Sequence, residues 1–124
     1  MRRTLVASIA TAVVSCAPAP SGIVPGKMHE VKVKNIAPFE AHEECVKLVA
    51  GDRLEYSFEA QFPLAFNIHY HEGNAVILPL TRENVKADSG EFKVLLPQDY
   101  CLMWEAGPSP TPLDYRVRLI RPGR

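Results

Sequence analysis

The sequence has no excess of charge of either sign and no long hydrophobic run. The chain carries 14 Lys and Arg residues against 14 Asp and Glu residues. Without a basic patch or stripe, we expect no nucleic-acid partner. The N-terminal apolar run, residues 4–14, is only 11 residues long, far short of the roughly 20 residues that a membrane-spanning helix needs. A transmembrane protein is therefore not predicted.

The sequence also lacks the common signatures of catalysis. It contains no Gly-x-Ser-x-Gly elbow, no phosphate-binding glycine loop and no Cys-x-x-Cys pair, which removes three frequent enzyme classes. No segment has convincing helical periodicity, and we find no internal repeat. We expect a protein without catalytic residues, and keep a hydrolase as the enzymatic alternative.

Cysteine is scarce, and the first of the three cysteines has its own context. Arg2 and Arg3 precede the apolar run, and Cys16 follows Val-Val-Ser. This arrangement resembles the signal peptide and lipobox of bacterial lipoproteins, in which the cysteine is acylated and becomes the mature N-terminus. The resemblance implies a signal peptide at residues 1–15 and lipidation at Cys16. The alternative is plain secretion, with cleavage after the Ala-Pro-Ala of residues 17–19.

Residues 16–28 are rich in proline and glycine and show no periodicity, as expected of a semi-rigid tether. Without Arg2 and Arg3, 12 basic residues face 14 acidic ones. We therefore predict a lipoprotein of the periplasm or outer membrane, held at the membrane by its lipid. A secreted protein is the alternative location.

The other two cysteines, Cys45 and Cys101, are 56 residues apart, and each lies in a segment that reads as a β-strand. Disulfides persist in oxidising compartments, so an exported chain with one lipidated cysteine has two left to pair. We predict a Cys45–Cys101 disulfide. Two buried thiols that act as small apolar side chains are the alternative.

Most of the sequence from residue 29 to residue 124 alternates between apolar and polar side chains, which is typical of half-buried antiparallel strands. Turn residues separate the alternating segments at four places: Gly51-Asp52, Gly73-Asn74, Ser89-Gly90 and Pro97-Gln98-Asp99. Pro79 indicates an edge strand at residues 75–80. We predict an all-β antiparallel sandwich of about eight short strands.

The order of these features resembles the GOLD (Golgi-dynamics) β-sandwich domain of secretory-pathway cargo receptors. The features are a cysteine strand at residues 44–52, an aromatic strand at 54–58, a further strand at 65–69, Gly-Glu-Phe at 90–92 and Tyr-Cys-Leu-Met-Trp at 100–104. The resemblance implies that Cys45 and Cys101 match the family's disulfide pair. The family's coiled coil, membrane span and sorting tail have no match in this sequence, so it implies a binding sandwich and not cargo trafficking.

The one chemically suggestive cluster is His69-Tyr70-His71-Glu72. Residues two apart on a strand point to the same face, so His69 and His71 are expected to project together from the polar face. Two imidazoles can share Cu²⁺ or Zn²⁺, and the further ligands considered are Glu72, His42 and the pair Glu43-Glu44. The alternative is an exposed polar face that holds two histidines by chance.

Residues 104–112 form a proline-rich segment with an aromatic residue at its base. Binding residues concentrate on loops held by a rigid scaffold, so Trp104 and Glu105 are candidates for a recognition loop. The alternative is a hairpin connection stiffened by prolines. We predict a non-enzymatic binding or structural module without a cofactor, with an envelope protein or other ligand as its partner. The alternative function is a small Cu- or Zn-binding lipoprotein that uses His69 and His71.

Overall fold

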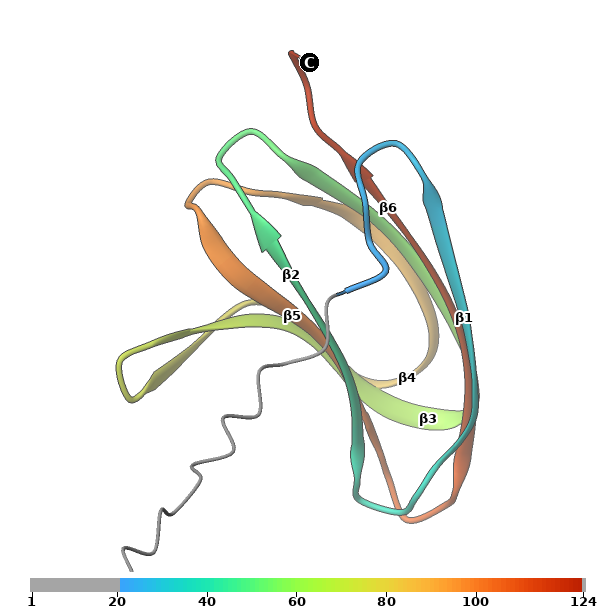
Figure 1. Cartoon of the computed structure of the whole chain (residues 1–124). Helices are drawn as coiled ribbons and strands as arrows, with labels where there is room; N and C mark the ends of the chain where they lie inside the picture. Colours follow the sequence, from blue (N-terminus) through green and yellow to red (C-terminus); the bar gives the residue numbers. More distant parts are fainter. Residues whose placement is uncertain (1–20, 124) are drawn as a thin grey trace, which may run out of the picture.

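The computed structural model describes residues 21–123, which fold into one antiparallel β-sheet of six strands (Figure 1). Cys16 and the predicted signal peptide lie outside the described residues. Within residues 21–123, no helix is long and apolar enough to cross a membrane. The strands are β1 (Met28–Ile36), β2 (Ala41–Leu48), β3 (Arg53–Glu72), β4 (Ala75–Lys93), β5 (Gln98–Ala106) and β6 (Thr111–Ile120).

The sheet curls into a half-barrel because β3 pairs with different neighbours along its length. Its first half, from Arg53 to Ala60, pairs with β6, and its second half, from Leu64 to His69, pairs with β5. β1 extends the β6 side and β2 extends the β5 side. The sheet therefore has two wings, β1–β6 and β5–β2, which face each other across the core in Figure 1.

The alternation of apolar and polar residues in the sequence correctly predicted which side chains face the inside of the curled sheet. Tyr56, Phe58, Phe66 and Ile68 of β3 are all at most 4% exposed and face inward. Between the wings, Trp104 is fully buried and forms the centre of the core. Its indole stacks on Phe66 and on Tyr115, with ring centroids 5.3 and 4.2 Å apart. The all-β class is thus confirmed, but the strands form one curled sheet where a two-sheet sandwich was predicted. The GOLD resemblance stays an expectation.

The prediction of about eight short strands was wrong, because β3 and β4 have 20 and 19 residues and replace several of them. The turn expected at Ser89-Gly90 lies inside β4. Gly90 allows close packing there, since the Cβ atom of any other residue would lie 2.9 Å from the Tyr56 hydroxyl oxygen. The edge position inferred from Pro79 is confirmed, because β4 pairs with β3 alone.

Part of the segment predicted as a tether, residues 16–28, is packed against the domain. Ile23 is 5% exposed and belongs to the core. The N–H of Gly26 donates to the carbonyl of Leu119 over 2.8 Å, and Pro25 forms a β-bridge with the same residue. The adjacent apolar pair Ile23-Val24 was the available signal for this packing.

The turn predicted at Gly51-Asp52 is confirmed, and it contains a buried carboxylate. Asp52 is 1% exposed and accepts two hydrogen bonds from the Arg121 guanidinium, at 2.9 and 2.8 Å. The backbone N–H of Val49 donates to the same carboxylate over 2.9 Å. The Arg121 hydrogen bonds lower the pKa of Asp52 below its ordinary value of 3.8.

We expect Asp52→Asn to lower the unfolding free energy at pH 7 by about 2 kcal/mol, because it removes the charge of a buried carboxylate that holds a partly exposed arginine. A carboxyl group whose pKa is lower in the folded state stabilises the fold at pH values above its unfolded pKa. That contribution is lost as the pH falls through the folded-state pKa. The difference between wild type and variant should therefore shrink as the pH falls below 3.8. Denaturant unfolding at several pH values from neutral to acidic tests this. Asp99→Asn at an exposed position is the control, and a difference independent of pH would refute the expectation.

The predicted disulfide is confirmed: Cys45 and Cys101 are bonded and stand directly opposite each other in the β2–β5 ladder. Cys45 is exposed, whereas Cys101 is 6% exposed. The bond lies on the outer face of the sheet, on the side away from Trp104. It therefore fixes the pairing of β2 with β5 and leaves the packing between the wings to the core side chains.

Candidate functional site

The first candidate site, which we call the His69 cluster, lies on the outer face of β2, β3 and β5. It consists of Glu43, Asn67 and His69 beside the Cys45–Cys101 disulfide. His69 pairs with Cys101 in the β3–β5 ladder. Oxygen, nitrogen and sulfur ligand atoms of Glu43, His69 and Cys101 all lie within 4.8 Å of one another.

The expectation that His69 and His71 form an exposed pair was wrong for His69, which is only 4% exposed. This part of β3 has strands on both sides, so side chains of neighbouring strands cover His69. His71, near the end of the strand, is exposed. The two rings meet edge to face with centroids 5.2 Å apart. Burial lowers the pKa of His69, and the nearby Glu43 carboxylate partly opposes this.

The hydrogen bonding of His69 defines which nitrogen faces the cluster. Nδ1 lies 2.7 Å from Oδ1 of Asn67, and since a carbonyl oxygen can only accept, Nδ1–H is the donor. Nε2 points to the Glu43 carboxylate, 3.4 Å from Oε1. That oxygen also lies 3.4 Å from Sγ of Cys45. A neutral His69 therefore presents a lone pair to a carboxylate.

The other metal ligands considered from the sequence do not join this cluster. Glu72 follows His71 on the strand, so it projects to the opposite face. His42 and Glu44 face inward, because the alternation of β2 places them on the same side as Val46 and Leu48. Only Glu43 of these candidates points outward toward His69. Of the predicted set, His69 and His71 thus lie side by side, whereas Glu72 projects away from them.

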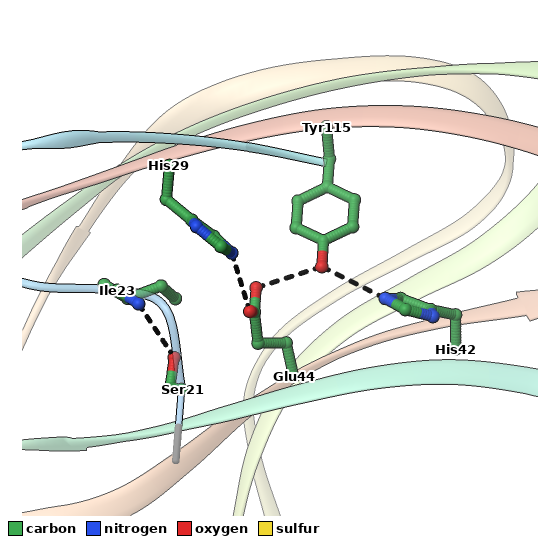
Figure 2. Close-up of polar contacts among 6 residues, drawn as sticks. All are labelled: Ser21, Ile23, His29, His42, Glu44 and Tyr115. Atoms are coloured by element: carbon green, nitrogen blue, oxygen red, sulfur yellow. Dashed lines mark hydrogen bonds and ion pairs between the residues drawn. The ribbon is translucent and has the colours of Figure 1, made fainter. Parts of the chain in front are cut away.

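His42 and Glu44 instead belong to a polar network between the two wings, which sequence reasoning missed (Figure 2). Tyr115 donates to Glu44 over 3.0 Å, and His42 Nε2–H donates to the Tyr115 oxygen over 3.0 Å. His29 of β1 lies 2.7 Å from the second Glu44 oxygen. Burial raises the pKa of Tyr115, and the nearby Glu44 carboxylate raises it further. The alternation of β2 was the available signal, because it predicts that both polar residues face inward.

This network ties the two wings together. His29 and Tyr115 come from the β1–β6 wing, whereas His42 and Glu44 come from β2 on the other side. The ring centroids of His42 and Tyr115 lie 5.5 Å from each other, and both rings also pack on the aromatic core. Its groups are satisfied by one another and adjoin the core, so we interpret the network as structural.

The second candidate site lies at the end of the molecule where the β1–β2 and β5–β6 connections meet, below the strands in Figure 1. We call it the Phe39 end, and define it by Phe39, Phe62 and the loop at residues 107–109. These side chains line a pocket of about 490 Å³, together with Glu83 and Glu105. Phe39 is 71% exposed and Phe62 is 41% exposed.

The backbone at Phe39 adopts a conformation that bulky residues rarely take. Its φ angle is +59°, in the left-handed region, where a non-glycine residue is strained. Two hydrogen bonds hold the turn: Phe39 N–H donates to the Gly107 carbonyl, and Glu40 N–H donates to the Ala37 carbonyl, both over 3.0 Å. The ring at this strained position is exposed to solvent.

Of the two residues predicted for a recognition loop, Trp104 is buried and only Glu105 is accessible. Trp104 is fully buried because it lies on the inner face of β5, and so it cannot contact a partner. Glu105 faces outward, is exposed and lines the pocket with Pro108 and Ser109. The alternation along β5 explains this division between adjacent residues.

A wider groove of about 850 Å³ crosses the outer face of β1, β6, β3 and β4. Charges of both signs line it, and Glu30 and Arg116 form an exposed ion pair of 3.2 Å within it. The groove lacks exposed aromatic residues and a cluster of one charge. It therefore gives less basis for a specific ligand than the Phe39 end.

Comparison with known proteins supports the fold alone. No protein-family model matches the chain, and no curated protein sequence matches it significantly. The crystal structure of PliG from Aeromonas hydrophila, a periplasmic inhibitor of g-type lysozyme, is similar with a TM-score of 0.55 and 9% identity, over 81% of this chain and 97% of PliG. A de novo designed double-stranded β-helix, solved by NMR, gives a TM-score of 0.39 and 24% identity, over 73% of this chain and 97% of the design.

Proposed function

We propose that this chain is a non-enzymatic binding module of the cell envelope that recognises a protein partner through its Phe39 end. The observation that carries the proposal is the exposed Phe39 ring, held in left-handed backbone beside an apolar pocket. Strained residues persist where the surrounding structure holds them and cluster at binding and catalytic sites. Aromatic residues are also the most frequent anchors of protein interfaces.

The charges around the pocket favour a basic partner surface. Glu83 and Glu105 line the pocket, and neither forms an ion pair within the described part of the chain. The neighbouring Arg82 is paired with Asp88 at 3.3 Å. An apolar centre with a polar rim is the usual layout of an interface. The partner we expect offers an apolar side chain flanked by Lys or Arg.

The proposed location follows from the sequence and the disulfide. The basic start, the short apolar run and Cys16 resemble a lipoprotein signal, which supports a lipid anchor at Cys16. The Cys45–Cys101 bond favours an oxidising compartment outside the cytoplasm. The similar fold of PliG, a periplasmic protein that binds another protein, is compatible with such a role.

Site-specific photo-crosslinking in intact cells tests the partner. A benzophenone amino acid is placed at Phe39 in one variant and at Phe62 in another. We expect both to capture the same protein, identified by mass spectrometry, because both rings line one pocket. The control position is Leu95, which is 82% exposed and lies outside the pocket. Equal capture from position 95 would show adventitious contact only and contradict the proposal.

Binding to the purified partner then gives the energetic test. Phe39→Ala should weaken binding by about 2 kcal/mol or more, as expected of an aromatic hot spot. Leu95→Ala should leave affinity within about 0.5 kcal/mol, as for a surface change outside the interface. The first purified candidate is a g-type lysozyme, because PliG of similar fold inhibits one. Unchanged affinity of Phe39→Ala for the captured partner would contradict the assignment of the Phe39 end.

A further inference from the structure

The His69 cluster gathers potential metal-ligand atoms around the Cys45–Cys101 disulfide. The cluster lies on the outer face of β2, β3 and β5 and shares no residue with the Phe39 end, so this inference is independent of partner binding. Its donor set is one carboxylate, one imidazole and two cysteine sulfurs. Mixed oxygen, nitrogen and sulfur ligands are those of Zn²⁺ sites.

Two features of His69 suit it to bind a cation. Its side chain is more than nine-tenths buried, and Nε2 faces the Glu43 carboxylate, 3.4 Å from Oε1. The Nδ1–H bond to Asn67 fixes the ring and directs the Nε2 lone pair into the cluster. Metal-binding histidines are oriented by such a hydrogen bond from their other nitrogen.

The distances suit one tetrahedral ion. Bonds of about 2.0–2.3 Å place the ligand atoms of Zn²⁺ about 3.3–3.8 Å from one another. The Glu43 oxygen already lies 3.4 Å from Nε2 of His69 and 3.4 Å from Sγ of Cys45. All three donors of the Glu43–His69–Cys101 group lie within 4.8 Å. Once the disulfide is reduced, the two sulfurs are free to separate and complete the shell.

We propose that reduction of the Cys45–Cys101 bond converts this face into a Zn²⁺ site. Its four ligands are the two thiolates, Nε2 of His69 and a carboxylate oxygen of Glu43. A dithiol supplies two electrons and two protons to the disulfide and is itself oxidised to a disulfide. Zn²⁺ then displaces the two thiol protons. Reoxidation by a disulfide reverses the electron flow and releases the ion.

Zinc titration of the full-length chain tests the proposal. The chain carries Cys16→Ser, so that no third thiol contributes, and a chromogenic chelator reports free Zn²⁺ without oxygen and with a phosphine reductant. We expect one Zn²⁺ per reduced chain, bound at least about 100-fold tighter than by the oxidised chain, since thiolates supply half of the ligand shell. His69→Ala should weaken binding about 10-fold or more.

The control is His71→Ala, which removes the neighbouring exposed imidazole and should change the affinity by less than about 3-fold because His71 is not a ligand. Equal affinity of oxidised and reduced chains would overturn the redox step. Equal affinity of the reduced chain with and without His69 would overturn the site, because the thiols alone would then bind the metal.

A second variant covers the case in which the reduced chain unfolds. Cys45→Ser leaves the Glu43–His69–Cys101 group without a disulfide, and we expect it to bind Zn²⁺ tighter than the oxidised chain does. Near-ultraviolet circular dichroism follows folding in each sample, since Trp104 and Tyr115 are stacked in the core. A reduced chain that stays unfolded with Zn²⁺, or a Cys45→Ser chain that binds no tighter, overturns the proposal.

Discussion

Reduction of the Cys45–Cys101 disulfide is expected to lower the melting temperature by about 10–20 °C. The bond joins residues 56 apart in sequence, and in the loop-entropy model closing such a loop stabilises by about 4 kcal/mol. For a domain of this size, the loss of about 3–4 kcal/mol corresponds to a shift of that order. The effect is large because the whole domain has a stability of only about 5–15 kcal/mol.

Thermal unfolding of oxidised and reduced protein measures this effect, in the presence of a metal chelator so that zinc cannot replace the bond. Mass spectrometry without reduction should find the peptides of Cys45 and Cys101 linked. Cys16→Ser is the control and should unfold at the temperature of the parent chain, because Cys16 is not part of the bond. A shift of less than about 3 °C would mean that the unfolded chain gains little freedom on reduction.

The sequence pattern predicted the parts of the fold that depend on local alternation. The alternation of Leu54, Tyr56 and Phe58, and of Phe66 and Ile68, placed these side chains correctly on the inner face. It could not show that both segments belong to one strand, because the bend between them depends on pairing first with β6 and then with β5. Partners distant in sequence set the length of β3.

Burial on the outer face was the main thing that the alternation could not predict. It placed His69 on the polar face, yet that residue is covered because β4 and β5 flank its strand. The proximity of Glu43 depends in turn on the pairing of β2 with β5. The alternation therefore could not predict that Glu43 is the acidic residue that lies beside His69.

The exposure of Phe39 had no signal in the sequence, because Phe39 lies in a connection between strands where no alternation predicts which side chains are buried. Its exposure results from the left-handed backbone at one residue and from a hydrogen bond to Gly107, which is distant in sequence. The prolines of the 104–112 segment were a usable signal, since they predicted a rigid loop. The loop lines the same pocket as Phe39.

The second large effect is expected from Trp104→Ala, because this indole fills the space between the two wings. Removing a buried aromatic side chain costs about 3–5 kcal/mol, which corresponds to a fall in melting temperature on the order of 15–25 °C. Phe66 and Tyr115 would lose the ring on which they stack. Thermal unfolding measures the shift, and a fall of less than about 5 °C would contradict the assignment of Trp104 to the core.

Trp104→Phe separates the size of the side chain from its polar group. The indole Nε1–H is buried without a hydrogen-bond partner in residues 21–123, and an unsatisfied buried donor costs about 1–3 kcal/mol. Phenylalanine loses part of the packing and removes this donor, so its net cost should be only about 1–2 kcal/mol. Crosslinking from position 39 should persist in Trp104→Phe, because the indole supports the wings and does not touch the partner. Loss of crosslinking in a folded Trp104→Phe protein would instead return Trp104 to the recognition surface.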